Sequence, residues 1–266
     1  MKRNVLINDG GLYKQPTLKV SQNFLTSRRI LMRLLQRTTI NKQDDVIEIG
    51  PGKGHITSLL IKKSHHVTAV ELDEYLYCKL CDKFIGIDKL TLIHKDFLQF
   101  RLPERSDYKV FANIPFSITT QIIRKLTECV NPPTDMWLTM EKGAAKRFLG
   151  KPFEIKSSLL LKPKFDIGIM YYFCRQDFHP MPNVDVVLIH IKKKDVSDIS
   201  ASEWTTYTKF ISCCMNGIGS VFTKRQWMRA LLMIGIKNDT LIRDIPYAEW
   251  VDLFRYKQTI KKMGKV

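Results

Sequence analysis

The chain has 266 residues, 44% of them hydrophobic, which is enough for one large domain and a small second one. Its formal charge of +17 and isoelectric point near 9.6 favour a polyanionic partner, with nucleic acid as the first candidate. No apolar run approaches the roughly 20 residues that span a bilayer, and the N-terminal stretch lacks the apolar core of a secretory signal, so we expect a cytoplasmic protein without membrane contact.

The first predicted element follows an N-terminal arm. Residues 1–18 contain Gly10, Gly11 and Pro16 and show no clear period, so we expect a flexible, basic arm. In residues 27–38, apolar side chains recur on one helical face and arginines occupy the other, which predicts an amphipathic helix. Apolar runs rich in β-branched residues then predict strands at 45–50, 66–72, 90–96, 108–114, 135–141, 169–174 and 184–192.

Helical stretches alternate with these strands, near residues 56–63, 73–84, 119–126 and 141–149. This alternation predicts an α/β fold, with a Rossmann-like, mostly parallel sheet and helices on both of its faces. Only the Pro-rich loop 178–183 joins the last two runs, so we expect them to form an antiparallel hairpin that closes the sheet. Residues 19–194 are therefore predicted to form one large domain.

After residue 194 the pattern changes to helices only, at 202–216, 223–235 and 248–260, which predicts a small all-α domain over residues 195–266. Both parts carry an excess of Lys and Arg, so we expect a nucleic-acid surface to span the cleft between them. One isolated C-x-x-C at 78–81 lacks a second ligand pair at zinc-site spacing. We therefore expect reduced thiols and no metal site.

The loop after the first strand, EIGPGKGHIT at 48–57, has the features of a ligand site. Gly50, Gly52 and Gly54 allow a ligand to approach the main chain, and the N–H groups of the helix that follows favour a negative group. The spacing excludes a P-loop and misses the dinucleotide fingerprint by one position. The loop alone is also compatible with a plain glycine-rich turn.

Acidic residues end the next two strands. Glu71 follows the glycines by about 20 residues, where a carboxylate can accept hydrogen bonds from both hydroxyls of a ribose. Asp96 ends the third strand, where it or its neighbouring backbone can meet an adenine amino group. Each can instead cap the following helix. Together they outline a ribose and an adenine along the strand ends, and S-adenosylmethionine fits, with its carboxylate at the helix start.

The fourth strand ends in Asn113-Ile114-Pro115-Phe116. Proline fixes its own φ and extends the residue before it, so an amide and a ring are held on a stiff turn. The same stretch is compatible with a strand-end turn above a core phenylalanine. The motifs elsewhere in the chain are needed to distinguish these two interpretations.

Six motifs in this order resemble those of the rRNA adenine N6-methyltransferases, and most closely the Erm methyltransferases of macrolide–lincosamide–streptogramin B resistance. They are SQNFLTS (21–27), EIGPGKGHIT (48–57), ELD (71–73), LIHKDFLQF (92–100), NIPF (113–116) and FHPMPNVDVVLI (178–189). The resemblance implies a seven-stranded class I methyltransferase domain that uses S-adenosylmethionine to modify an adenine of 23S rRNA, and a C-terminal domain that binds RNA. We expect a monomer.

Residue by residue, the resemblance places the methyl donor against Asn23, Leu25, Gly50, Gly52, Glu71, Asp96 and Asn113. The chain departs from the family pattern at Pro51, where serine or threonine is frequent, and at Phe116, where tyrosine is commoner. The missing hydroxyl at position 116 removes a possible hydrogen bond but keeps the face of the ring, so we expect activity to be retained.

The chemistry at NIPF is predicted to be one of orientation, because the N6 lone pair of adenine is conjugated into the ring and is a poor nucleophile. The Asn113 side-chain oxygen and the Ile114 main-chain carbonyl can each accept a hydrogen bond from the amine. Pro115 keeps the turn rigid. Phe116 offers a stacking face for the target base, and Phe178 is predicted to provide the opposite face once the base has left its own stack.

Two basic stretches are predicted to meet rRNA phosphates, although solvated helix faces explain them as well. They comprise Lys142, Lys146 and Arg147, and Lys224, Arg225 and Arg229.

Three rival functions remain at this point. The sister family of small-subunit rRNA adenine dimethyltransferases usually has leucine at the position of Ile114, and DNA adenine methyltransferases normally have two prolines in this motif. An rRNA-binding assembly or transcription factor without turnover is a third, and the intact glycines, Glu71 and Asn113 argue against it.

Overall fold

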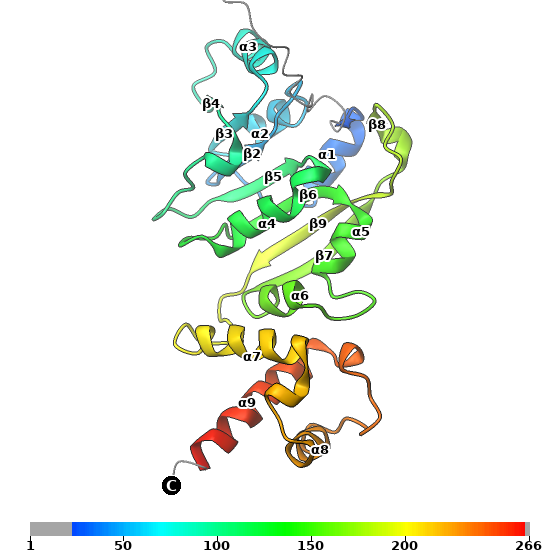
Figure 1. Cartoon of the computed structure of the whole chain (residues 1–266). Coiled ribbons are helices and arrows are strands. Elements are labelled where there is room, and N and C mark those ends of the chain that lie inside the picture. The colour runs from blue at the N-terminus through cyan, green and yellow to red at the C-terminus, as the bar shows by residue number, and fades with distance from the viewer. Residues whose placement is uncertain (1–22, 264–266) are drawn as a thin grey trace, which may run out of the picture.

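The computed structural model describes residues 23–263, so the predicted arm at 1–18 lies outside the described residues. Its centre is a seven-stranded sheet with the order β4-β3-β2-β5-β6-β9-β7 (Figure 1). The strands are β2 (Asp45–Ile49), β3 (His66–Glu71), β4 (Leu90–His94), β5 (Lys109–Asn113), β6 (Asp135–Glu141), β7 (Phe165–Tyr172) and β9 (Val186–Lys193). A separate two-stranded pair joins β1 (Phe24–Leu25) to β8 (Phe178–His179).

All seven predicted strands of the sheet are confirmed, and so is the mostly parallel arrangement. Strands β2 to β6 pair in parallel, whereas β9 is antiparallel to both β6 and β7. The predicted hairpin is therefore the pair β7–β9, with β8 in the connection between them. Strand β7 begins at Phe165, four residues before the predicted start, and forms the edge of the sheet.

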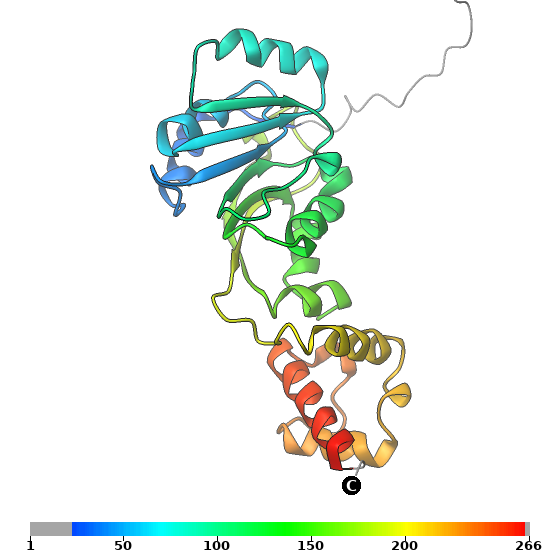
Figure 2. The same cartoon turned by 90° about the vertical axis from the view of Figure 1, so that its left-hand side faces the viewer.

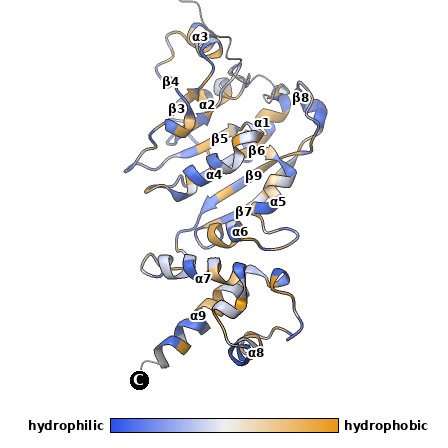
Figure 3. Cartoon of the chain, in the orientation of Figure 1, coloured by the Kyte–Doolittle hydropathy of each residue, from blue (hydrophilic) through white to orange (hydrophobic). Residues whose placement is uncertain are grey.

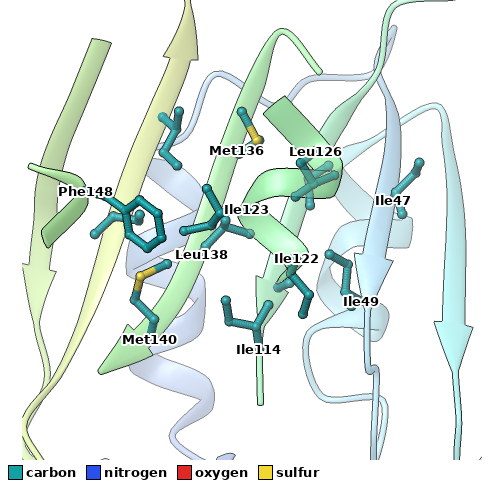
Figure 4. Packing of buried hydrophobic residues seen from close by; sticks show 14 of the residues in the cluster. Ile47, Ile49, Ile114, Ile122, Ile123, Leu126, Met136, Leu138, Met140 and Phe148 are labelled. Carbon is teal, nitrogen blue, oxygen red and sulfur yellow. The ribbon is translucent and has the colours of Figure 1, made fainter. Parts of the chain in front are cut away.

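Helices cover both faces of the sheet, as predicted. On one face α1 (Arg28–Gln36) and α2 (Thr57–Lys63) contribute to a core with β2, β3 and β5. On the other face α4 (Thr119–Glu128) and α5 (Lys142–Phe148) pack against β5, β6 and β9. Figure 4 shows Ile122, Ile123 and Leu126 of α4 against side chains of β6 in this second core. Because both faces are covered, the central strands read as continuous apolar runs.

Two further helices complete this domain. Helix α3 (Glu74–Lys83) lies between β3 and β4, and its N-cap Asp73 accepts a hydrogen bond from Leu76 N. The short helix α6 (Lys156–Leu161), which the sequence did not predict, leads into β7.

The last part of the chain forms a group of helices below the sheet (Figures 1 and 2). They are α7 (Trp204–Asn216), α8 (Lys224–Met233) and α9 (Tyr247–Met263). Tyr207, Trp250 and Phe254 are at most 1% exposed and centre a core of their own, to which Leu159 of α6 also belongs. Apolar residues alternate with polar ones around these helices (Figure 3). Among residues 23–263, no helix is long and apolar enough to cross a membrane.

Candidate active site

A pocket lies at the carboxyl ends of the neighbouring strands β2, β3 and β5. It is lined by Asn23, Phe24, Gly50, Gly52, Glu71, Asn113, Ile114, Pro115 and Phe116. Three of the motifs that lie far apart in the sequence, QNFL, the glycine loop and NIPF, therefore face one space. Ligands of open α/β sheets bind in a crevice at the carboxyl ends of the strands.

The glycine loop has a backbone that only glycine adopts without strain. Gly50 and Gly52 have φ angles of +63° and +58°. A Cβ at Gly52 would also lie 2.5 Å from the ring of Phe24, whereas nothing among the described residues lies within 4 Å of one at Gly50. The loop main chain is therefore open to a ligand at Gly50 and covered by Phe24 at Gly52.

Glu71 holds the end of this loop. Its carboxylate is 2% exposed and accepts hydrogen bonds from Gly52 N at 2.9 Å, Leu72 N at 2.9 Å and Asp73 N at 3.0 Å. A carboxylate has about four acceptor positions, so one remains for a ligand hydroxyl. A fixed acceptor beside an open main chain fits the ribose of S-adenosylmethionine.

Glu48 is a buried acid that sequence reasoning missed. It lies in the middle of β2 and is 1% exposed. Burial raises the pKa of Glu48 to about 8, and the nearby charge of Glu71 adds to the shift. The available signal was an acidic residue inside VIEIG at 46–50, a stretch that contains no other charged residue.

Asn113 faces the pocket from the end of β5 in a defined orientation. Its side-chain nitrogen Nδ2 donates a hydrogen bond of 2.7 Å to the main-chain oxygen of Asn23. Because a carbonyl oxygen only accepts, this bond fixes which end of the amide is the nitrogen. The amide oxygen therefore lies on the side away from Asn23 and can accept a hydrogen bond from a ligand.

The residues after Asn113 form the rest of the turn. Ile114 N donates to the Thr139 oxygen at 3.2 Å, which extends the β5–β6 pairing by one residue. Pro115 has a φ of −61°, and Phe116 begins a single 3₁₀ turn. The side chain of Ile114 is 2% exposed and belongs to the core, whereas Phe116 is half-buried and lines the pocket.

The pairing of β1 with β8 brings QNFL next to the FHPMP motif, with Leu25 opposite Phe178. Both of these side chains are 3% exposed, and the ring of Phe178 meets that of Phe173 edge to face at 5.1 Å. Neither residue lines the pocket. In this structure the face predicted for base stacking at Phe178 is buried, and its role, like that of Leu25, stays a prediction.

Asp96 takes the capping position that the sequence offered as its alternative. Its Oδ1 accepts a hydrogen bond of 2.8 Å from Leu98 N at the start of a 3₁₀ turn, Phe97–Gln99. It does not line the pocket. An adenine contact by Asp96 or its neighbouring backbone stays a prediction.

The predicted phosphate contacts fall into two groups. Lys146 and Arg147 are exposed on α5, which begins where β6 ends, beside the strand that carries Asn113. Lys142 lies at the start of α5 but pairs with Asp185 at 3.4 Å. Lys224, Arg225 and Arg229 are exposed on α8, in the helical group below the sheet (Figure 1). No cluster of three or more metal-ligating side chains occurs in the described part of the chain.

The Rossmann-like sheet and this pocket define an S-adenosylmethionine-dependent methyltransferase. A family model described as "Ribosomal RNA adenine dimethylase" matches residues 15–259, and the chain belongs to that family. A relative named "rRNA adenine N-6-methyltransferase" from Escherichia coli is 34% identical, over 89% of this chain and 94% of its own length. The relative of the same name from Limosilactobacillus reuteri is 36% identical, over 89% and 95%. The protein is thus an rRNA adenine N6-methyltransferase.

Two solved structures share the fold over nearly the whole described chain. The "23S rRNA methyltransferase ErmE" has a TM-score of 0.81 at 21% identity and covers 89% of this chain and 100% of its own. A "dimethyladenosine transferase from Plasmodium falciparum" has a TM-score of 0.71 at 18% identity and covers 88% and 98%. At these identities the likeness establishes the fold, including the helical C-terminal part.

Proposed function

We propose that this enzyme acts in the cytoplasm and transfers a methyl group from S-adenosylmethionine to N6 of one adenine in 23S rRNA. The methylated rRNA then confers macrolide–lincosamide–streptogramin B resistance on the cell. The NIPF motif at 113–116 supports the large-subunit target, because Ile114 occupies the position where the small-subunit family usually has leucine. The observation that carries the reaction type is the fixed amide of Asn113 beside Phe116 in the pocket.

The donor is held along the ends of β2 and β3. Glu71 accepts a hydrogen bond from the ribose, and the open main chain at Gly50 faces the donor's methionine end. When bound, S-adenosylmethionine supplies an electrophilic sulfonium methyl. The main-chain oxygen of Asn23 accepts a hydrogen bond from the Asn113 side chain. This bond links the donor side of the pocket to the acceptor side.

The target amine is oriented by acceptors at the end of β5. The Asn113 side-chain oxygen and the Ile114 carbonyl each accept a hydrogen bond from the N6 amino group, which turns the nitrogen lone pair towards the methyl and supports the positive charge that develops on nitrogen. Since the amine carries little charge before the reaction, this interaction strengthens mainly in the transition state.

The base is gripped by Phe116, whose ring lines the pocket. Stacking on such a ring contributes about 1–3 kcal/mol per base. A second face from Phe178 requires its ring to leave the contact with Phe173. Exposed cations on α5 and α8 neutralise rRNA phosphates, so affinity for RNA falls steeply with salt.

The second candidate is a small-subunit rRNA adenine dimethyltransferase. The description of the matching family model names a dimethylase of ribosomal RNA without stating the subunit, and it is therefore compatible with this candidate as well. Both candidates use the same pocket and differ in the RNA that reaches it.

The test is to express the chain in a host without endogenous methylases and to map methylated adenines on both rRNAs by reverse-transcription stops. We expect one strong stop in 23S rRNA and macrolide resistance in the same cells. A pair of stops in 16S rRNA without resistance would establish the second candidate. An Asn113→Ala chain at equal protein level is the control for stops that do not depend on methyl transfer.

A further inference from the structure

A second pocket lies away from the active site, on the sheet edge nearest the C-terminal helices. It is formed by the outer strands β7 and β9 and by the C-terminal end of α1. Three residues lie side by side on neighbouring strands here. His190 of β9 pairs with Trp137 of β6 on one side and with Gly168 of β7 on the other. Directly paired residues of neighbouring strands project from the same face of a sheet.

The ring of His190 is held rigidly in this row. It stacks on Trp137 with centroids 5.0 Å apart and planes 1° from parallel. Its Nε2 lies 2.7 Å from Oδ1 of Asp135, whose other oxygen accepts a hydrogen bond from Thr39. Trp137 is 1% exposed and the side chain of Asp135 9%, while that of His190 is 30% exposed. One face of the imidazole is therefore covered by Trp137, and its orientation is fixed by a buried carboxylate.

The opposite side of His190 is open. Gly168 has no side chain, and nothing in the described part of the chain lies within 4 Å of a Cβ built there. The slot above Gly168 is bordered by Arg37 and Lys192, with Asp166 and Met170 along β7. A flat ring would fit beside the imidazole, and the two cations stand where an attached anionic group would lie.

We propose that this slot binds one unpaired nucleotide of the RNA substrate, with its base stacked on the free face of His190 and its phosphate between Arg37 and Lys192. The proposal rests on the proposed function for the nature of the polymer, and it adds a contact outside the catalytic pocket. A planar base extends the stack that Trp137 and His190 begin, and guanidinium and ammonium groups are the usual partners of phosphate. Asp166 accepts a hydrogen bond from the 2′-hydroxyl or from a base amino group.

The slot and the catalytic pocket are close enough for one RNA molecule to occupy both. Asn113 pairs with Thr139 in the sheet, and Trp137, two residues earlier in that strand, pairs with His190. Two strand spacings and two residue steps separate the Cα atoms of Asn113 and His190 by about 12 Å. The slot therefore anchors a segment near the flipped adenine.

The test uses the full chain with its donor pocket filled by S-adenosylhomocysteine, and fluorescein-labelled hexauridylate as the probe. Gly168→Ile fills the slot with a β-branched side chain that suits a strand, and Thr91→Ile on the opposite edge strand β4 is the matched control. Fluorescence anisotropy at fixed salt should show affinity about tenfold weaker for Gly168→Ile, as expected from the loss of one stacked base, and unchanged for Thr91→Ile. Thermal unfolding and donor titration verify that both variants fold.

A second readout locates the contact. Hexauridylate with a single 4-thiouridine should crosslink to residues 165–172 or 186–193 in the wild-type chain, and Gly168→Ile should abolish that crosslink. Equal affinity and an unchanged crosslink in folded Gly168→Ile protein would overturn the slot. Uridine monophosphate binding as tightly as hexauridylate would instead assign the slot to free nucleotides and overturn the RNA contact. Failure of the wild-type chain to methylate rRNA would count against the proposed function alone, since probe binding is measured without turnover.

Discussion

The two sides of the active pocket are built in different ways. On the donor side, Gly50, Gly52 and Glu71 come from consecutive strand–turn units, and the carboxylate is bonded to three main-chain N–H groups before any ligand arrives. On the acceptor side, Asn113 depends on a main-chain oxygen from residue 23, which is 90 positions away. The donor side is thus preorganised by local chain geometry, and the acceptor side by a long-range contact.

This difference teaches where binding and catalysis should separate. Main-chain groups and a buried carboxylate recognise a donor that is the same in every turnover. A single amide and an aromatic ring act on a base whose charge changes during the reaction. Substitutions on the donor side should therefore change donor affinity, whereas substitutions on the acceptor side should change the rate at saturating donor.

The largest effect is expected for Asn113→Ala. Removing one preorganised group that supports transition-state charge lowers kcat by about 10²–10³-fold. Calorimetric titration should show donor affinity close to that of the wild type, while transfer of a labelled methyl group to rRNA nearly disappears. Asn113→Asp keeps an acceptor oxygen but cannot donate to Asn23, so we expect an intermediate rate. A near wild-type rate in the alanine variant would refute the role given to Asn113.

Glu71→Ala tests the donor side in the same way. Loss of the one hydrogen bond from the donor's ribose to this charged group, which contributes roughly 1.5–3 kcal/mol, weakens donor binding by about 10–100-fold. It also leaves the buried N–H of Gly52 without its partner. Calorimetry with S-adenosylmethionine measures the effect, and Glu74→Ala on the exposed start of α3 is the control. Unchanged donor affinity would remove the ribose contact from Glu71.

Two substitutions of Phe116 distinguish the contribution of the ring face from that of a hydroxyl group. Phe116→Ala should weaken capture of the base about tenfold, seen as a higher KM for RNA, because one stacking face is lost. Phe116→Tyr keeps the ring and should stay close to the wild-type value. If the tyrosine variant lost as much as the alanine variant, the ring face would not be what grips the base.

Glu48 makes the stability of the folded chain sensitive to pH. Its folded-state pKa of about 8 lies above the ordinary value of 4.5, so between these values the folded chain binds a proton that the unfolded chain has released. The free energy of unfolding therefore falls as pH rises through this window, by at most about 1.4 kcal/mol per pH unit. Urea unfolding from pH 5 to 8 should show this slope in the wild type and a flatter profile in Glu48→Gln. Identical profiles would show that Glu48 does not titrate in this range.

The smallest effect compares two glycines of one loop. Gly50→Ala forces alanine into a left-handed backbone, at about 1–2 kcal/mol. Gly52→Ala does the same and also places a methyl group against the Phe24 ring, so its melting temperature should be lower still. Both chains are compared by thermal unfolding without ligand. Equal melting temperatures would mean that Phe24 moves aside freely.

Much of the fold was predictable because it is written in local patterns. Apolar runs rich in β-branched residues, helical stretches between them and glycine turns indicated the seven strands, the helices that separate them and the helical end of the chain. The same local logic indicated Gly50 and Glu71, since a turn and a strand end are defined by neighbouring residues. The short helix α6 and the β1–β8 pair escaped prediction, because six-residue and two-residue elements carry too little period to detect.

The sequence by itself determined the alternation of strands and helices, the glycine loop, and the presence of an amide and a ring after the fourth strand. Tertiary structure alone decided that β9 inserts between β6 and β7, that Asn23 orients Asn113, and that the ring of Phe178 is buried. The physical reason is range. Local conformation depends on steric and hydrogen-bonding preferences over a few residues, whereas strand order and side-chain partners depend on which distant apolar faces are buried together.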